Sequence, residues 1–384
     1  MHYPLVGGDR VKTYHLIRHL SVKNDLTVVT YENSQKESMG CAIDPSEWPF
    51  DLYTVKFNKK KAYSSIVINA LSNIPIEIYY YTQKDYANLV TELTRSNSFD
   101  LLISYFTRTI EFGKNIPIRK LLILDDCRSL YQYRSYQSST ELIQKALRYS
   151  EYLKLRKYEA DNLRNYDLVT VVSEHEAMAL NGKIDPRKLR ILSNGVDLND
   201  FAMPRGHTGR RNIVFSGRLD LWANQLMIER IVNDIFPTVR REIEGVKLIL
   251  VGGNPGRRIR RLEGDDIEVR ADVASVAPYL REAALFLHPH SGGSGIQNKL
   301  LEAMACGCPI VTTPTGIHGI GVSHGKEVLI GASNRELAEL SIGVLRNEHL
   351  AADLARSARL FVEQNHTWET VFRSMDEAIE QLFR

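Results

Sequence analysis

The chain has 384 residues, 43% apolar and 25% charged, which is enough for two packed α/β domains because single hydrophobic cores stop growing below this length. Its 49 Lys and Arg residues nearly balance 46 Asp and Glu residues, so no overall field attracts nucleic acid. Four scattered cysteines argue against a disulfide scaffold, and neither a signal peptide nor a membrane-spanning apolar run is evident, so we expect a cytoplasmic protein.

Short β-branched segments alternate with longer segments of helical period, which indicates βα units that build parallel sheets. The first half predicts strands at 26–30, 52–55, 101–104, 121–124, 168–172 and 189–192. Between them it predicts helices at 9–20, 63–71, 84–95, 143–165 and 174–180. A doubly wound domain also places a strand before its first glycine-rich turn, but only a few residues precede Gly7 and Gly8. This first strand is therefore expected to be short or missing.

The second half repeats the alternation, with strands predicted at 213–216, 246–251, 267–270, 285–287, 310–312 and 328–330. Residues 199–211 combine proline, glycine and basic residues without periodicity, which is typical of a linker. We therefore predict an N-terminal domain over 1–198 and a C-terminal domain over 212–366. Residues 367–384 have apolar residues at helical spacing and are predicted to form a last helix that packs back across the junction.

The strongest functional signal lies where the strand at 285–287 leads into a glycine-rich turn and then a helix at about 297–305. This layout directs backbone N–H groups and the positive end of the helix at a ligand, which suits a diphosphate. Gly292, Gly293 and Gly295 allow close approach of the backbone. On the helix, Glu302 can accept hydrogen bonds from two ribose hydroxyls. The alternative is a turn that only joins a strand to a helix.

Four motifs together resemble glycosyltransferase family 4, a family of retaining enzymes with the GT-B fold. In the donor-binding segment of that family, a glutamate before an Ala-Met-Ala run binds the donor ribose, and Glu302 holds this position in GIQNKLLEAMACGCPIVTT. The resemblance covers about the last half of the chain. The other matching segments are Ser193–Asp197 followed by Phe201, the strand ending in Gly217-Arg218, and the strand ending in Val251-Gly252-Gly253.

The resemblance implies two Rossmann-like domains that face each other across a cleft. It implies a nucleoside diphosphate sugar on the C-terminal wall, with Gly252 and Ser294 beside it, and an acceptor on the N-terminal wall. It also implies transfer of the sugar to a hydroxyl with retention, in the synthesis of a glycan, polysaccharide or glycolipid. Two alternatives remain: a nucleotide-sugar 2-epimerase, which needs no acceptor, and a non-catalytic subunit that binds a sugar nucleotide without turnover.

Two departures from the family pattern concern the donor. Many members have a first glutamate eight residues before the ribose-binding one, where this chain has Ser294, so sugar recognition must differ. A Gly-Arg-Leu-x-x-x-Lys run commonly supplies an arginine and a lysine to the diphosphate, but no lysine follows Arg218 at that spacing. Because a subset of the family resembles the run from Asn298 to Glu302, we predict that Lys299 is the replacement cation. The alternative for Lys299 is a solvated surface lysine.

The N-terminal half resembles the family less closely. Gly7 and Gly8 look like the Gly-Gly loop that approaches the β-phosphate and the acceptor, although they could equally form a plain helix start capped by Asp9. Asp125 and Asp126 follow a predicted strand, and analogy favours Asp126 as the carboxylate that orients the acceptor hydroxyl. Such aspartates also serve as helix caps.

No metal site is predicted. The histidines lack ligand spacing except at His288 and His290, where the intervening Pro289 disfavours a shared ligand face. The GT-B fold binds the diphosphate with cations and helix ends, so no cofactor is expected. Two basic clusters, Lys59–Lys61 and Arg257–Arg261, are either solvated surface or a peripheral contact with anionic lipid at the inner face of the membrane.

Overall fold

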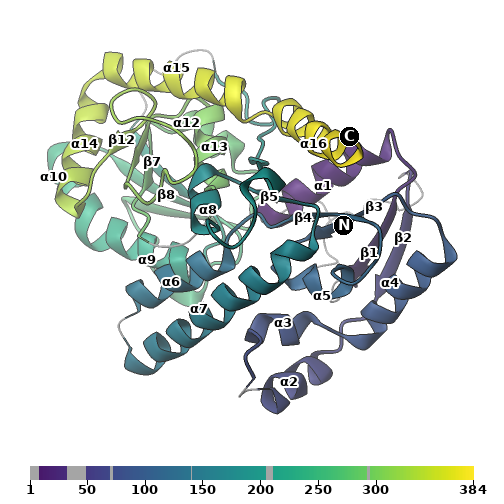
Figure 1. Cartoon of the computed structure of the whole chain (residues 1–384). Helices are drawn as coiled ribbons and strands as arrows, with labels where there is room; N and C mark the ends of the chain where they lie inside the picture. Colours follow the sequence, from purple (N-terminus) through teal and green to yellow (C-terminus); the bar gives the residue numbers. More distant parts are fainter. Residues whose placement is uncertain (1–7, 33–48, 70–71, 140, 205–210, 292–294) are drawn as a thin grey trace. The chain divides into compact units, whose positions relative to one another are not determined.

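A computed structural model describes the chain as two compact units of parallel strands and helices (Figure 1). The described residues are 8–32, 49–69, 72–139, 141–204, 211–291 and 295–384. Unit 1 comprises the chain up to Ser193 together with Phe372–Arg384, and unit 2 comprises Asn194–Val371. The boundary between the units therefore lies before the linker that the sequence indicates at 199–211.

Unit 1 contains two parallel sheets among its described residues. A pair of strands, β1 (Thr27–Tyr31) and β2 (Asp51–Val55), forms one sheet. The other has the order β3-β4-β5-β6, with β3 at Leu101–Tyr105, β4 at Arg119–Ile123, β5 at Leu168–Val171 and β6 at Leu189–Ile191. The helices are α1 (Gly8–Ser21), α2 (Lys59–Ile68), α3 (Ile76–Tyr81), α4 (Lys84–Ser96), α5 (Ile110–Gly113), α6 (Arg128–Ser138), α7 (Leu142–Asn162) and α8 (Glu174–Ala179).

The place of the predicted first strand is not filled by any described residue of unit 1. In a doubly wound sheet of order 3-2-1-4-5-6, that strand would lie between β1 and β3. The residues before Gly8 are outside the described part of the chain. Around the remaining strands the core forms as expected for parallel strands covered on both faces, because every residue of β5 is buried.

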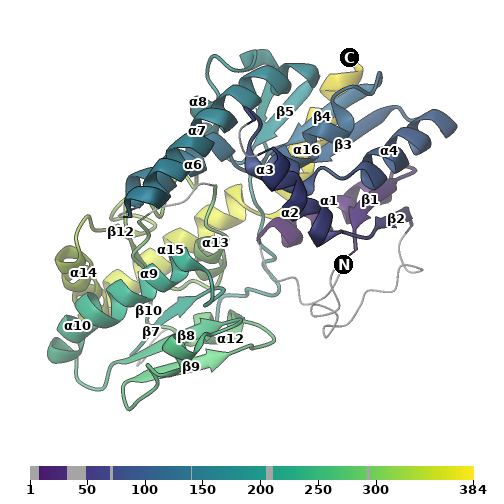
Figure 2. The ribbon, with the colours of Figure 1, turned by 90° about the horizontal axis from the view of Figure 1, so that it is seen from below.

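Unit 2 has one parallel sheet of order β12-β11-β10-β7-β8-β9, and Figure 2 shows β10, β7, β8 and β9 in this sequence. Its strands are β7 (Asn212–Ser216), β8 (Lys247–Gly252), β9 (Ile267–Ala271), β10 (Leu285–His288), β11 (Ile310–Thr312) and β12 (Leu329–Ile330). Its helices are α9 (Trp222–Arg230), α10 (Phe236–Glu242), α11 (Arg257–Arg260), α12 (Ala277–Glu282), α13 (Asn298–Ala305), α14 (Asn334–Arg346) and α15 (Glu348–Asn365). The order is that of a complete doubly wound sheet.

The last helix, α16 (Trp368–Phe383), begins in unit 2 and joins unit 1 from Phe372 onward. Within unit 1 its Asp376 accepts a hydrogen bond from His19 of α1 at 2.7 Å, and the Phe372 ring stacks on His19 with 4.3 Å between ring centroids. The predicted return of the C-terminal helix to the N-terminal domain is confirmed.

All twelve strands predicted from the sequence occur, each within two residues of its expected bounds. The predicted helix at 63–71 instead begins at Lys59, because the Asn58 side chain accepts a hydrogen bond from the Lys61 amide and caps the helix earlier. Within the described ranges, no helix combines the length and the apolar content needed to cross a bilayer.

Candidate functional site

In the parallel sheet of unit 2, the direction in which the chain adds successive strands reverses between β7 and β10. From β7 the chain proceeds outward through β8 to β9, and it then returns to β10 on the other side of β7 and continues to β11 and β12. Loops that leave the carboxyl ends of β7 and β10 consequently diverge, and ligands of doubly wound sheets bind where such loops separate. The helix α13 follows β10, so it begins at this same edge.

Two positions at this edge favour glycine, one because of close backbone contact and both because of a positive φ. Gly252, at the end of β8, has a φ of +151°, and a Cβ on it would lie 1.8 Å from the Gly217 carbonyl oxygen. Gly217, which follows β7, has a φ of +144°. The Leu219 amide also donates to the Gly253 carbonyl at 2.8 Å. The backbones of the Gly-Arg and Val-Gly-Gly motifs therefore pack directly against each other, and this contact fixes the loop after β7.

Lys299 points to the same loop. Its Nζ donates a 2.6 Å hydrogen bond to Asn224 Oδ1, and Asn224 Nδ2 donates to the Arg218 carbonyl at 2.7 Å. The ammonium also lies 5.1 Å from the centre of the Phe215 ring. The residue keeps partial exposure, but burial of the ammonium end lowers the pKa of Lys299 to about 8. Lys299 is therefore not a solvated surface lysine.

Glu302 lies one helical turn after Lys299 on α13, and the charges of the two side chains interact. Burial raises the pKa of the Glu302 carboxyl to about 7, and the Lys299 ammonium offsets part of this increase. Among the described residues, no hydrogen bond occupies the carboxylate. A partly buried carboxyl group beside a buried ammonium is an arrangement typical of functional sites.

Arg218 has a carboxylate partner of its own. Its Nη2 lies 2.6 Å from Asp220 Oδ2, and its Nε donates to Asp220 Oδ1 at 3.1 Å. Both side chains are more than a third exposed, which weakens the pair through solvent screening. To contact a phosphate, the Arg218 guanidinium must therefore either bind the phosphate and Asp220 together or leave Asp220.

Asn298 and Gly295 belong to the same segment as Lys299 and Glu302. The Asn298 Oδ1 atom accepts a 2.7 Å hydrogen bond from Asn194 Nδ2, which connects the start of α13 to the motif at 193–197. Gly295 has a φ of +72°, which favours glycine. The candidate residues Gly7, Gly292, Gly293 and Ser294 lie outside the described residues, and Gly8 is the first residue of α1.

A buried histidine at the end of β10 was not expected to matter. His288 Nδ1 lies 3.1 Å from Thr312 Oγ1, whose hydroxyl donates to the His288 carbonyl, and burial lowers the pKa of His288 well below its usual value. In the described structure, His288 Nε2 and the buried Ser216 Oγ have no hydrogen-bond partner. Since buried polar atoms are normally satisfied, these two atoms give the edge unused hydrogen-bonding capacity.

In unit 1, Asp125 and Asp126 after β4 have separate environments. The Asp125 carboxylate accepts hydrogen bonds from Lys12 Nζ at 2.7 Å and from the Tyr105 hydroxyl at 2.5 Å. Lys12 is buried, which lowers its pKa against the effect of Asp125, and it also donates to the Leu192 carbonyl. Asp125 has a φ of +61°, in the left-handed region. Asp125 therefore connects α1 and β3 to the end of β4.

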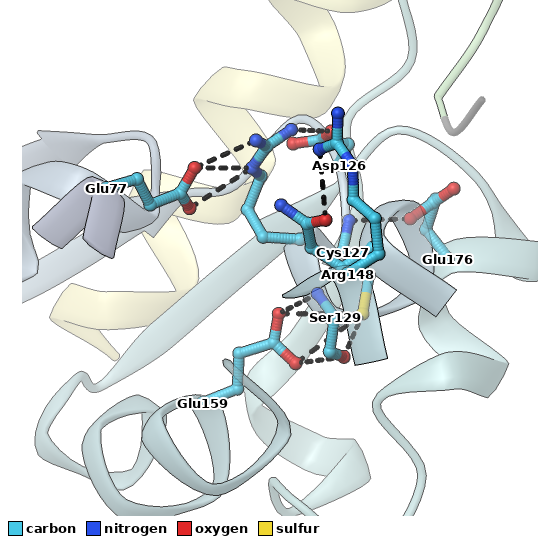
Figure 3. A network of polar contacts seen from close by, with 9 residues as sticks. Glu77, Asp126, Cys127, Ser129, Arg148, Glu159 and Glu176 are labelled. Carbon is cyan, nitrogen blue, oxygen red and sulfur yellow. Dashed lines mark hydrogen bonds and ion pairs between the residues drawn. The ribbon is translucent and has the colours of Figure 1, made fainter. Parts of the chain in front are cut away.

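Asp126 pairs with Arg128 instead. The Asp126 Oδ2 atom lies 3.2 Å from Arg128 Nη1, while Arg128 Nη2 and Nε bind Glu77 of α3. Both carboxylates that pair with this guanidinium, those of Glu77 and Asp126, are labelled in Figure 3. Asp126 is about a fifth exposed, so it keeps access to solvent while its charge is neutralised.

The start of α6, just after Asp126, is anchored by a buried carboxylate. Glu159 of α7 accepts hydrogen bonds from the Ser129 amide at 2.9 Å and from the Ser129 hydroxyl at 2.5 Å, and it pairs with Lys183 Nζ at 2.6 Å. Figure 3 shows Glu159 beneath Ser129 and Cys127. Burial raises the pKa of the Cys127 thiol to about 12, so the thiol stays protonated. Glu159 thus fixes the loop that carries Asp126.

Glu174 is exposed at the start of α8, where the Ser173 hydroxyl caps the helix by accepting from the Glu176 amide. No group of three or more His, Cys, Asp or Glu side chains is arranged for a metal ion anywhere in the described ranges. Sequence reasoning missed Asn224, Lys12 and Glu159, because their partners lie 75, 113 and 30 residues away along the chain.

Comparisons with known proteins bear on the family and the fold of the chain. Residues 210–347 match the family model "Glycosyl transferases group 1". A curated relative, an uncharacterized 44.6 kDa protein in the cps region of Klebsiella pneumoniae, is 21% identical over 74% of this chain and 75% of its own length.

Two solved structures show the same fold. The sucrose-phosphate synthase of Thermosynechococcus elongatus matches with a TM-score of 0.74 and 19% identity, over 98% of this chain and 94% of its own. The Anabaena HepE protein in complex with UDP-glucose matches with a TM-score of 0.69 and 15% identity, over 99% of this chain and 97% of its own. The fold is GT-B, and together these findings support glycosyltransferase activity.

Proposed function

We propose that this GT-B protein, whose residues 210–347 match the glycosyl transferases group 1 family model, transfers a sugar from a nucleoside diphosphate to an acceptor hydroxyl with retention. The observation that carries the proposal is the pairing of Lys299 and Glu302 on one face of α13, at the edge where β7 and β10 separate. Glu302 would accept hydrogen bonds from the donor ribose, and Lys299 would contact the diphosphate.

The Lys299 contact supports its assignment as the substitute cation. In the family pattern a lysine follows Gly-Arg-Leu by a few residues, and in this chain Ala223 and Asn224 occupy that region. Lys299 reaches Asn224 itself, with Nζ 2.6 Å from Oδ1. A cation that comes from α13 therefore occupies the neighbourhood of the absent lysine, and the asparagine amide holds it there.

Chemistry at this edge would depend on charge stabilisation. As the nucleoside diphosphate departs, negative charge develops on the β-phosphate, and the Lys299 ammonium, Arg218 and nearby backbone N–H groups would stabilise it. Asp126 would orient the acceptor hydroxyl from unit 1. Because HepE binds UDP-glucose, UDP sugars are the first donors to test.

Glu302→Ala is expected to weaken nucleotide binding. Loss of a charged acceptor of ribose hydrogen bonds should cost about 1.5–3 kcal/mol, or roughly tenfold to hundredfold in affinity. Calorimetric titration of UDP and GDP into the wild type and the variant measures this directly. Glu336→Ala, which changes an exposed glutamate of α14, is the control. Equal affinities for wild type and Glu302→Ala would remove the ribose assignment.

The donor step is expected to have an alkaline limit set by Lys299. The charged form of this amine is the active one, and its pKa is about 8. Since kcat/KM reports the free enzyme, kcat/KM for the donor should fall as the pH rises through about 8. In Lys299→Arg the cation stays charged at all these pH values, so the fall should disappear. A pH profile of kcat/KM that is identical in both proteins would show that another group titrates.

Turnover is expected to survive excess EDTA. The Asp125 carboxylate is engaged by Lys12 and Tyr105, and Asp126 by Arg128, so the adjacent aspartates do not form a shared metal site. Initial rates measured with EDTA, and again after addition of Mg²⁺ or Mn²⁺, test this prediction. Activity that is lost in EDTA and restored by either cation would contradict a metal-independent mechanism.

A further inference from the structure

Arg108 lies on aromatic rings just after β3, in the short 3₁₀ turn Thr107–Thr109. Its guanidinium carbon is 4.7 Å from the centre of the Tyr81 ring and 4.6 Å from the centre of the Phe106 ring. Among the described residues, no carboxylate pairs with this guanidinium and no group accepts a hydrogen bond from it. The side chain is partly exposed, so its N–H donors are available to a ligand.

The turn that carries Arg108 has an unusual backbone. Phe106 has a φ of +71° and a ψ of 155°, a region in which glycine is found almost exclusively. The Phe106 amide donates to the Ile123 carbonyl at 2.7 Å, and the Thr109 hydroxyl donates to the Phe106 carbonyl at 2.8 Å, which holds this conformation. The Thr107 hydroxyl in the same turn is buried and has no hydrogen-bond partner among the described residues. Strained backbone and unsatisfied buried polar groups are both more frequent at ligand sites than elsewhere.

The second ring that contacts Arg108 is also held in place. Tyr81 ends α3, and its carbonyl accepts a hydrogen bond from the Tyr31 hydroxyl at 2.5 Å. Its ring lies 5.0 Å from the Tyr80 ring and 5.9 Å from the Phe57 ring. Because both rings are fixed, Arg108 is preorganised, and less side-chain entropy is lost when it binds a ligand.

Arg108 and Asp126 lie at the same edge of their sheet. Arg108 follows β3 and Asp126 follows β4, and these two strands are parallel neighbours paired along their whole length. Helix α3 contacts both positions, because Glu77 binds Arg128, the partner of Asp126, and Tyr81 contacts Arg108. Residues four apart on a helix share a face, and neighbouring strands are closely spaced, so Arg108 and Asp126 border a common region roughly 5–10 Å across.

Two further cations at this edge are already bound to carboxylates. Lys12 pairs with Asp125 at 2.7 Å, and Arg128 pairs with two carboxylates, Asp126 among them. Arg108 differs from both, since the described part of the chain provides no counter-ion for it. The planar fork of a guanidinium matches a carboxylate or a phosphate with two parallel hydrogen bonds. The ligand group that suits Arg108 is therefore an oxyanion.

We propose that Arg108 determines acceptor specificity by binding a carboxylate or a phosphate group on the acceptor, while Asp126 orients the hydroxyl that receives the sugar. The acceptor is then an anionic saccharide whose acidic group lies on the same sugar ring as the reacting hydroxyl or on the next one. This inference rests on the proposed function, because it assumes that an acceptor binds at the carboxyl edge of the sheet in unit 1.

Binding of simple sugars to the full chain tests the inference. Glucose 6-phosphate and glucuronic acid, with neutral glucose as the reference, are titrated at constant ionic strength and followed by ligand-detected NMR. We expect at least one anionic sugar to bind at least about tenfold more tightly than glucose, and Arg108→Gln to abolish this preference. Arg108→Lys keeps the charge but not the fork, so it should keep only part of the preference. The anionic sugar that binds more tightly identifies the acidic group as a phosphate or a carboxylate.

Arg119→Gln is the matched control. Arg119 begins β4 at the opposite edge of the same sheet, and its guanidinium carbon lies 4.6 Å from the centre of the Phe383 ring. This variant should keep the preference for the anionic sugar, and circular dichroism should show that every variant is folded. A preference that survives in Arg108→Gln, an equal loss in Arg119→Gln, or anionic sugars that bind the wild type no better than glucose would overturn the inference.

Nucleotide titrations separate this inference from the proposed function. The donor residues lie in unit 2, so Arg108→Gln should bind UDP with the same affinity as the wild type. A wild type that binds no nucleotide would contradict the proposed function, whereas the comparison of sugars between wild type and Arg108→Gln would still decide whether Arg108 binds an oxyanion.

Discussion

Lys299→Met should lower kcat by about 10²–10³-fold while the KM for the donor changes much less. The reason is that a buried cation at a departing phosphate acts mainly when charge develops, as a single oxyanion donor does. Methionine keeps the unbranched stem beside Phe215, so the change removes charge with little loss of packing. Steady-state kinetics with varied donor separates the two constants.

Lys247→Met is the matched control, because Lys247 is half exposed and pairs with Glu268 at the start of β8. It should change both constants by no more than about a factor of two. Asp220→Asn adds a second comparison, since it releases Arg218 from its carboxylate and should lower the donor KM if Arg218 contacts the phosphates. Near-normal turnover in Lys299→Met would leave Arg218 as the side-chain cation of the site.

Glu159→Ala should lower the free energy of unfolding by about 3–5 kcal/mol, because it leaves the Lys183 ammonium and the Ser129 amide without their buried partner. Urea denaturation followed by circular dichroism measures the loss. Asp161→Ala removes an exposed ion pair from the same helix and should cost less than about 1 kcal/mol.

A double change distinguishes loss of the pair from loss of packing. Glu159→Met with Lys183→Met removes both charges while keeping most of the side-chain volume, and such replacements of buried pairs are often neutral. We therefore expect the double variant to be more stable than Glu159→Ala. Equal stability of Glu159→Ala and Asp161→Ala would mean that the buried pair does not anchor α6.

The strands were predictable because the chemistry that defines them is local. Parallel strands that are covered on both faces have short, nearly continuous apolar sequences, and β7, β8 and β10 are such sequences. The helix α6 was not predicted. It buries Ser129, Gln132 and Ser135 instead of an apolar stripe, and its start is held by Glu159 from another helix.

The candidate site also has features that the local sequence predicts and features that only the tertiary structure shows. Glu302, Lys299 and Arg218 lie in motifs, so their positions could be inferred from residue order. Their partners could not, because Asn224 meets Lys299 only through the packing of α9 against the end of β7, and no spacing in the sequence encodes that contact. The hydrogen bond from Lys12 to Asp125 depends in the same way on tertiary packing, while Asp126 pairs with Arg128, which lies two residues further along the chain.

The central claim is that α13 binds a nucleoside diphosphate through Glu302 and Lys299. Calorimetric titration of the wild type with UDP, GDP, ADP, CMP and dTDP, repeated on Glu302→Ala combined with Lys299→Met, tests it most directly. We predict that at least one nucleotide binds the wild type and that its affinity falls by at least about tenfold in the double variant. Binding of the same nucleotide with equal affinity to both proteins, or of none of the five to the wild type, would contradict the account.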